Sequence, residues 1–200
     1  MARKKRRMPR WFRWTLLALA PLVLFNLTVA FFGNSAVFPL SPFFLRSKAL
    51  ALAHYAWHRP HCLFQEHEPL GKHVAHAETK HHLPRGLLAA LIEVESNGRV
   101  HRISSAGAMG PAQLTPDTAR MMGVSDPFDP ASGIDGSARY LAAQLATFHD
   151  AKLALAAYNA GPGAVVGRAI PKNGESESYV RKVMAAYQSR QPAPLVANAK

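Results

Sequence analysis

The sequence predicts a mainly α-helical domain behind an N-terminal transmembrane helix. Three observations support this prediction. One long apolar stretch lies near the N-terminus, the rest of the chain has the start and stop signals of short helices, and no stretch alternates as a half-buried β-strand does. The 200 residues allow one domain plus an anchor, and the lone cysteine, Cys62, excludes an intrachain disulfide framework.

The net charge of +12 is concentrated at the N-terminus. Seven of the 24 Lys and Arg residues fall within residues 1–13, which leaves 17 basic against 12 acidic residues, or +5, in the remainder. A domain of this charge does not require DNA or RNA, so we predict no nucleic-acid partner. Residues 1–13 instead have the composition of a basic cytoplasmic tail.

Residues 14–32 carry no charge and are predominantly apolar. At about 1.5 Å per residue this stretch crosses a hydrocarbon core of about 30 Å. We therefore predict an uncleaved signal anchor that crosses the bacterial inner membrane once and leaves the following chain in the periplasm. A cleavable signal peptide is the alternative, although its apolar region is usually shorter and Thr28-Val29-Ala30 is a weak cleavage site.

Residues 33–67 are predicted to form a membrane-proximal neck rich in histidine. Pro39 and Pro42 break any second span, so residues 33–46 are expected to lie against the membrane or on the domain. Residues 47–57 predict a short helix.

Eight of the ten histidines fall within residues 54–82. His54 and His58 have the spacing of a metal pair on one helix face. No carboxylate or thiol completes a ligand set at motif spacing, so we predict a solvated helix and loop, with no metal and no other cofactor.

Residues 68–188 predict one mainly α domain, large enough to bury a core. Its boundaries come from capping residues such as Thr115, from prolines in first turns and from glycines at helix ends. The expected helices cover residues 84–95, 115–123, 136–149, 152–159, 163–170 and 177–188. Residues 189–200 have the composition of a loose C-terminal tail.

One carboxylate continues an apolar stripe. Leu88, Leu91 and Ile92 lie at i, i+3 and i+4 on one helix face, and Glu95 follows at i+7. Burial raises the pKa of a carboxyl group, and a raised pKa suits a general acid near neutral pH. The alternative is a glutamate at a helix end that bends into water.

Two further segments contain groups suited to a glycan. Residues 104–114 are a run of small residues that leads to Gln113, whose amide can both donate and accept hydrogen bonds. Tyr158 and Asn159 place a phenol and an amide at a helix end, where an aromatic ring can stack on a sugar. A flexible surface loop and a core tyrosine are the respective alternatives.

Together these segments resemble the soluble lytic transglycosylase family, whose catalytic domain is lysozyme-like. The resemblance covers about residues 70–188. Its four blocks are Glu95-Ser96, residues 104–114, residues 157–161 and residues 175–180, the last reading Glu-Ser-Glu-Ser-Tyr-Val. Four positions depart from the usual pattern: Ala112, Thr115, Gly133 and Ser176.

The resemblance implies a site and a reaction. Glu95 is the implied catalytic acid and base, and Glu175 a buried structural or orienting carboxylate. The residues implied to bind the substrate are Ser104, Gln113, Tyr158 and Asn159. The implied substrate is peptidoglycan, cut between N-acetylmuramic acid and N-acetylglucosamine so that a 1,6-anhydro end forms, without a cofactor.

Two other functions stay open. A hydrolytic muramidase on the same fold needs a second carboxylate, and Asp117, Asp126 and Asp129, which fit helix caps and turns, could fold back to supply one. A non-catalytic glycan-binding scaffold subunit of an envelope complex is the third reading, because fold does not determine function.

Overall fold

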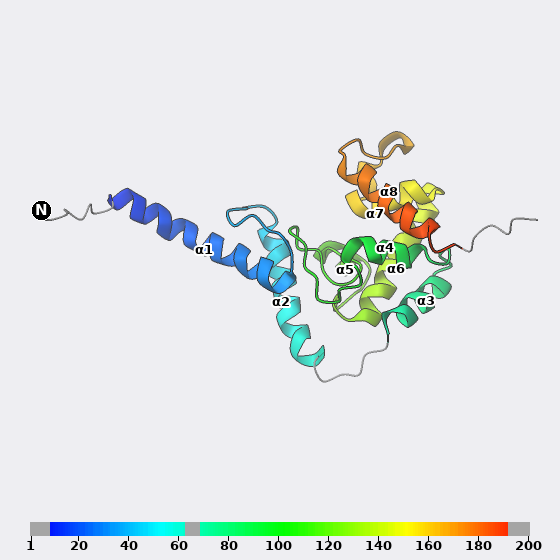
Figure 1. Cartoon of the computed structure of the whole chain (residues 1–200), viewed down its shortest axis with the longest axis horizontal. Helices are drawn as coiled ribbons and strands as arrows, with labels where there is room; N and C mark the ends of the chain where they lie inside the picture. Colours follow the sequence, from blue (N-terminus) through cyan, green and yellow to red (C-terminus); the bar gives the residue numbers. More distant parts are fainter. Residues whose placement is uncertain (1–8, 63–68, 192–200) are drawn as a thin grey trace, which may run out of the picture.

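The computed structural model describes residues 9–62 and 69–191, which are mainly helical and contain no β-strand (Figure 1). Most of the predicted basic tail, residues 63–67 of the predicted neck and most of the predicted C-terminal tail lie outside the described residues. The predicted mainly α fold is confirmed.

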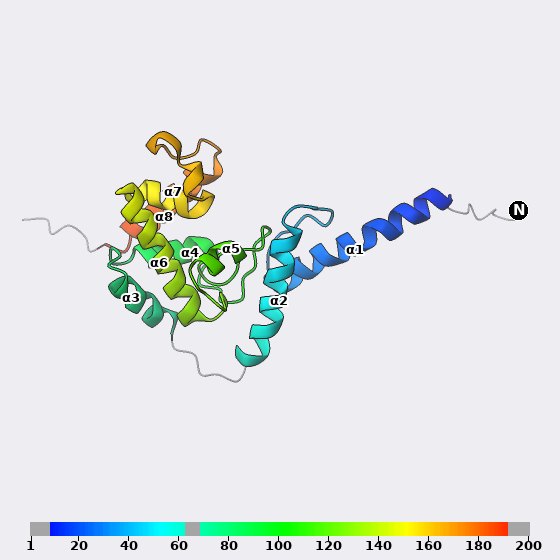
Figure 2. The same ribbon diagram turned by 180° about the vertical axis from the view of Figure 1, so that it is seen from behind.

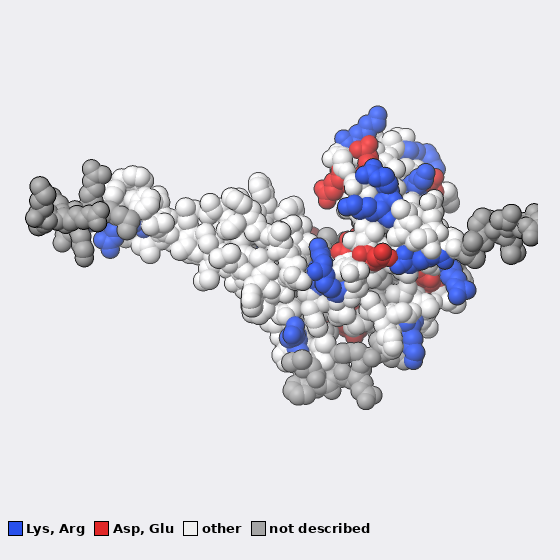
Figure 3. Space-filling model, viewed as in Figure 1, with Lys and Arg blue, Asp and Glu red and all other residues white. Residues whose placement is uncertain are grey.

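The chain begins with two helices, α1 (Arg10–Gly33) and α2 (Leu45–Cys62). α1 projects away from the remaining helices (Figure 1). Within the described residues it is the one helix that is long and apolar enough to cross a membrane. The sequence of α1 contains no charged residue beyond Arg10 and Arg13, and most of its length is white in the face drawn in Figure 3.

A buried amide ties the two helices together. Asn26 of α1 is fully buried, and its Nδ2 donates to the carbonyl oxygens of Leu22, Pro39 and Ser41. Its Oδ1 accepts a hydrogen bond of 2.7 Å from Nζ of the buried Lys48 on α2. The turn between α1 and α2 is thereby fixed at its base, because buried polar groups need such partners.

In the described part of the domain, the helices α3 to α8 pack together (Figures 1 and 2). α4 packs against α8, and α6 packs against both α3 and α7. Their bounds are α3 (Leu70–Lys80), α4 (Leu87–Ser96), α5 (Pro116–Met121), α6 (Pro130–Phe148), α7 (Ala151–Ala160) and α8 (Glu175–Gln188).

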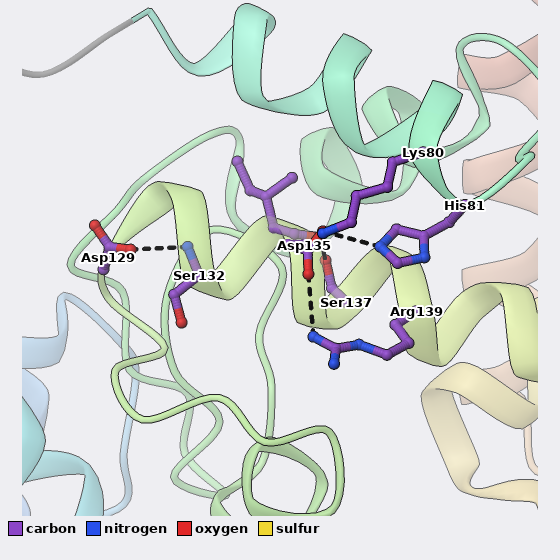
Figure 4. Close-up of polar contacts among 8 residues, drawn as sticks. Lys80, His81, Asp129, Ser132, Asp135, Ser137 and Arg139 are labelled. Atoms are coloured by element: carbon purple, nitrogen blue, oxygen red, sulfur yellow. Dashed lines mark hydrogen bonds and ion pairs between the residues drawn. The ribbon is translucent and has the colours of Figure 1, made fainter.

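α6 begins at Pro130, six residues earlier than predicted. The Asp129 side chain caps its N-terminus (Figure 4). Gly133, which was expected before the helix, and Gly136 both lie inside it, and a Cβ at either position would collide with the 124–127 loop. These glycines permit close packing, which the sequence pattern does not distinguish from helix breaking.

Three other predicted helices differ from the structure. The helix expected over residues 163–170 is a pair of short 3₁₀ turns, because Gly167 and Arg168 adopt positive φ angles. α4 begins at Leu87 and not at residue 84, because Gly86 has a φ of 88°. α2 extends beyond the predicted residues 47–57 at both ends.

A charged cluster joins α3 to α6 (Figure 4). Asp135 of α6 accepts from Nζ of Lys80 at 2.8 Å and Nε2 of His81 at 2.9 Å, and it pairs with Arg139 at 3.0 Å. Burial opposes ionisation of Asp135, but the hydrogen bonds from Lys80 and His81 outweigh it and hold the pKa below its usual value.

The end of α1 and the neck pack on the domain through a small second core, which we call the junction core. Ile103 donates its backbone N–H to the Gly33 carbonyl at 3.1 Å. A Cβ on Gly107 would lie 2.5 Å from the backbone of Ser47. α1 and α2 therefore support the segment that leads into residues 104–114. The core consists of Val29, Ala51, Ile103, Met109 and Phe128.

Candidate active site

All six predicted site residues line one pocket, which we call the Glu95 pocket. Its volume is about 270 Å³. α4, the loop before α5, α7 and α8 each contribute to its wall. The predicted residues that meet there are Glu95, Ser104, Gln113, Tyr158, Asn159 and Glu175.

Glu95 lies in the last turn of α4, where it is half-buried. Leu88, Leu91 and Ile92 on the same face are buried, so the predicted stripe is present. Burial raises the pKa of Glu95 from 4.5 to about 7, and a hydrogen bond from Tyr179 opposes this shift only in part. The carboxyl group therefore retains a substantial protonated fraction at neutral pH.

Tyr179 of α8 is the partner that sequence reasoning did not assign. Its hydroxyl donates to Oε1 of Glu95 at 2.7 Å. Burial and the neighbouring Glu95 raise the pKa of this phenol well above its ordinary value, so it remains a donor. A signal was available, because Tyr179 belongs to the fourth block of the family resemblance.

Ser104 organises the loop over residues 104–114. Its Oγ accepts from the backbone N–H groups of Ala106 at 3.2 Å and Ala108 at 3.0 Å. These bonds leave the hydroxyl proton available to a ligand. Ser104 thus has a structural role and can still contribute a donor to the pocket.

Gln113 has a positive φ of 52° and a buried side chain. Its Nε2 donates to the carbonyl oxygens of Arg102 at 3.2 Å and Gly110 at 2.8 Å. Both amide protons are therefore used within the loop. The expectation that Gln113 offers a donor as well as an acceptor is wrong in this structure, and only Oε1 remains for a ligand.

Tyr158 combines the two alternatives considered for it. Its hydroxyl donates to the Ala112 carbonyl at 2.9 Å, and its ring packs on Tyr140 with centroids 5.2 Å apart. It is a core tyrosine whose ring also lines the pocket. Asn159 follows at the end of α7, where its Oδ1 accepts from Ser176 at 3.4 Å.

Glu175 is exposed, and the expectation of a buried carboxylate is wrong. It is the first residue of α8, directly after Gly174. An acidic group in a first helical turn is stabilised by the helix dipole without burial. Glu175 therefore brings a second, solvated carboxylate to the Glu95 pocket.

The three aspartates considered as a second carboxylate do not line this pocket. Asp129 caps α6, and Asp126 accepts from the backbone N–H of Phe128 at 3.0 Å. Asp117 pairs with Arg120 at 3.0 Å on the exposed face of α5. The cap interpretation of Asp129, the turn interpretation of Asp126 and the first-turn position of Asp117 are confirmed, and the cap of α5 is Thr115.

Residues 72–182 match the Transglycosylase SLT domain family. The chain belongs to this family. Its relatives include the transglycosylase of Enterobacteria phage PRD1, 35% identical over 54% of this chain and 39% of the relative. Another is the membrane-bound lytic murein transglycosylase F 2 of Alkalilimnicola ehrlichii, 38% identical over 46% of this chain and 22% of the relative.

Among solved structures, the chain is similar to an inactive mutant of the lytic transglycosylase Slt from Pseudomonas aeruginosa. The TM-score is 0.52 at 23% identity, over 72% of this chain and 30% of that protein. This likeness supports the fold alone. The matches span well under half the length of these relatives, so family membership rests on the SLT domain.

This SLT domain has a larger hollow of about 780 Å³ on the opposite side of α4. Its two carboxylates already have partners. Glu78 caps α4, and Glu93 pairs with Arg190 at the start of the predicted C-terminal tail. The raised pKa of Glu95 and the convergent hydroxyl, amide and aromatic groups favour the smaller Glu95 pocket as the candidate active site.

Proposed function

We propose that this chain is a membrane-anchored lytic transglycosylase. It cleaves peptidoglycan between N-acetylmuramic acid and N-acetylglucosamine and leaves a 1,6-anhydro end. One observation carries the proposal: the half-buried carboxyl of Glu95 has a pKa of about 7 in a pocket lined by hydroxyl, amide and aromatic groups. Such a carboxyl serves as acid and as base near neutral pH.

The first step is protonation of the leaving group. Because Oε1 of Glu95 accepts from Tyr179, the proton lies on Oε2 and is given to the glycosidic oxygen as the bond to C1 breaks. The carboxylate that forms lies in a poorly solvated site. The Tyr179 hydrogen bond then strengthens, because hydrogen bonds to a charged acceptor are stronger than those to a neutral one.

The second step returns the proton. The C6 hydroxyl of the N-acetylmuramic acid attacks C1 of the same residue and gives its proton to the Glu95 carboxylate. This transfer restores the protonated Glu95. The nucleophile is tethered to the substrate, so no second protein carboxylate has to deliver water. The Gln113 amide oxygen and the Ser104 hydroxyl hold the sugar, with Tyr158 and Asn159 at the reacting subsite.

A second candidate function is a hydrolytic muramidase. Glu175 favours it, because this exposed carboxylate lines the same pocket and could activate a water. The two candidates differ in their products. Hydrolysis leaves a reducing end, and transglycosylation leaves an anhydro end that is lighter by one water.

We further propose that α1 anchors the protein in the inner membrane with the SLT domain in the periplasm. The basic residues before the span support this orientation. Phe38, Phe43 and Phe44, which follow α1, are 60–69% exposed, as expected of side chains that lie in the membrane interface. The domain would then act on glycan strands near the membrane surface.

The test is mass spectrometry of the fragments that the full chain, purified in detergent, releases from peptidoglycan. We expect anhydro ends from the wild type and from Glu175→Gln, and none from Glu95→Gln. Reducing ends that disappear in Glu175→Gln would establish the muramidase instead. Binding to peptidoglycan without any release would favour the scaffold subunit.

A further inference from the structure

Three potential metal ligands converge at the contact between neck and domain, beside the junction core. His58 and Cys62 lie one turn apart on α2, and His101 lies between α4 and the 104–114 loop. Their potential ligand atoms all fall within 4.8 Å of one another. We call this group the junction cluster. His54, which the sequence paired with His58, is not part of it.

His58 is already oriented as a metal ligand would be. The residue is 4% exposed, and its Nδ1 contacts a carboxylate oxygen of Asp126. Its Nε2 is buried and has no hydrogen-bond partner in residues 9–62 and 69–191. A histidine that donates Nδ1–H to a carboxylate presents the Nε2 lone pair, which is the outer-shell arrangement of metal-bound histidines.

We propose that His58, Cys62 and His101 bind a zinc ion, with a water molecule as the fourth ligand. Two imidazoles and a thiolate are donors that zinc prefers, whereas magnesium and calcium prefer oxygen. Tetrahedral zinc bonds of about 2.0–2.3 Å set such donors about 3.4–3.6 Å apart. The cluster therefore needs to close by about an ångström, which side-chain rotation supplies.

The charges and the surroundings suit this ion. The Cys62 thiolate and the Asp126 carboxylate together balance two positive charges. Phe128, which is fully buried, packs beside both imidazoles, with centroids 5.9 Å from His58 and 6.3 Å from His101. An apolar wall limits solvent access and strengthens electrostatic attraction within the site.

The proposed zinc would join α2 to the segment that shapes the Glu95 pocket. Two residues separate His101 from Ser104, and Ile103 already contacts Gly33. The ion would thus fix the base of the 104–114 loop against the neck. Zinc binding is tested independently of catalysis, so its failure and the failure of the proposed function are distinguishable.

The experiment uses the full chain in detergent, reduced and freed of metal with a chelator. Zinc is titrated against a chromophoric chelator, and cobalt is added separately to report thiolate ligation by its near-ultraviolet charge-transfer absorption. We expect one zinc per chain at submicromolar Kd, with a cobalt–thiolate band. Cys62→Ser and His101→Gln should each weaken zinc binding by about 100-fold, and Asp126→Asn by about 10–100-fold.

His54→Gln and His61→Gln are the matched controls, because they remove neighbouring histidines of α2 that lie outside the cluster. Both should bind zinc as the wild type does. Circular dichroism and thermal melting of the metal-free variants separate lost ligands from lost fold. Zinc held equally well by Cys62→Ser and His101→Gln, or no submicromolar binding by the wild type, would overturn the proposal. Tight binding of copper(I) alone would also overturn the assignment of zinc.

Discussion

A glutamate carboxylate lies at each end of helix α4, and the two carboxylates differ in the hydrogen-bond donors that surround them. At its N-terminus, the buried Glu78 of α3 accepts hydrogen bonds of 2.9–3.3 Å from three backbone N–H groups. At its C-terminus, Glu95 accepts from the single hydroxyl of Tyr179. The helix dipole favours negative charge at the first end and disfavours it at the second.

The comparison shows that the two carboxylates at the ends of one helix differ in how many donors stabilise their charge. Glu78 is surrounded by donors, which stabilise its charge and make it a cap for α4. Glu95 loses water without gaining equivalent donors, so its pKa rises to about 7. The predictions test the proposed division between a structural carboxylate, Glu78, and a reactive one, Glu95.

The largest expected effect is on catalysis. Glu95→Gln should lower kcat by about 10³-fold or more, because loss of a general acid–base costs about 10²–10⁴-fold and this group serves in both steps. Turnover of purified peptidoglycan measures the change. Glu93→Gln is the matched control, since Glu93 is an exposed glutamate on the same helix, and it should retain activity. A similar loss in both variants would contradict the assignment.

The next effect is on stability. Glu78→Ala should lower the free energy of unfolding by about 2–4 kcal/mol, because three N–H groups at the start of α4 lose their acceptor. Denaturant unfolding of the full chain in detergent measures this. Glu177→Ala removes a glutamate that accepts one N–H at the exposed start of α8, and should cost about 0.5–1 kcal/mol. Equal losses of unfolding free energy in the two variants would show that the buried Glu78 cap stabilises no more than an exposed cap.

The third effect is a pH-dependent stability difference. Because the folded-state pKa of Glu95 is raised from 4.5 to about 7, stability from its neutral form is present below pH 4.5 and lost as the pH rises through 7. Glu95→Gln carries no such charge. It should therefore melt higher than the wild type at pH 8, by the equivalent of about 1–3 kcal/mol.

At pH 4.5 this advantage of the Glu95→Gln variant should nearly vanish. Thermal melts of both proteins at the two pH values provide the measurement. A constant difference across this range would show that the Glu95 carboxyl titrates normally. The catalytic proposal would then lose its main support.

Much of the Glu95 pocket could be predicted because each of its groups lies in a short contiguous segment. Helical periodicity alone predicted that Glu95 lies on the same helix face as Leu88, Leu91 and Ile92. No information about other helices was needed. Gln113 was found through the run of small residues that leads to it, and Ser104 through the family resemblance of the same segment. Sequence patterns within one segment can therefore identify pocket residues that lie in that segment.

Contacts between distant segments could not be predicted in the same way. The Tyr179–Glu95 hydrogen bond spans 84 residues and depends on how α8 packs against α4. The junction cluster joins Cys62 to His101, and no periodicity or spacing links these positions. The early start of α6 was missed for the same reason, since the role of Gly136 is set by Val124, which it approaches in space.

The smallest predicted effect concerns the donor that Glu95 retains. Tyr179→Phe removes a hydrogen bond that lowers the Glu95 pKa, so that pKa should rise further, by less than about one unit. In a pH profile of kcat/KM, the wild type should lose activity as Glu95 deprotonates above about pH 7. The variant should show this loss at higher pH, with a maximal rate lower by about 10-fold.

Tyr187→Phe is the matched control, because Tyr187 is a partly buried tyrosine on the same helix that packs against the main core. It should leave the profile unchanged. If Tyr179→Phe instead lost activity at a lower pH than the wild type, the phenol would favour the neutral carboxyl over the carboxylate. Tyr179 would then stabilise the acid before the reaction, and the carboxylate formed in the first step would need another donor from the pocket.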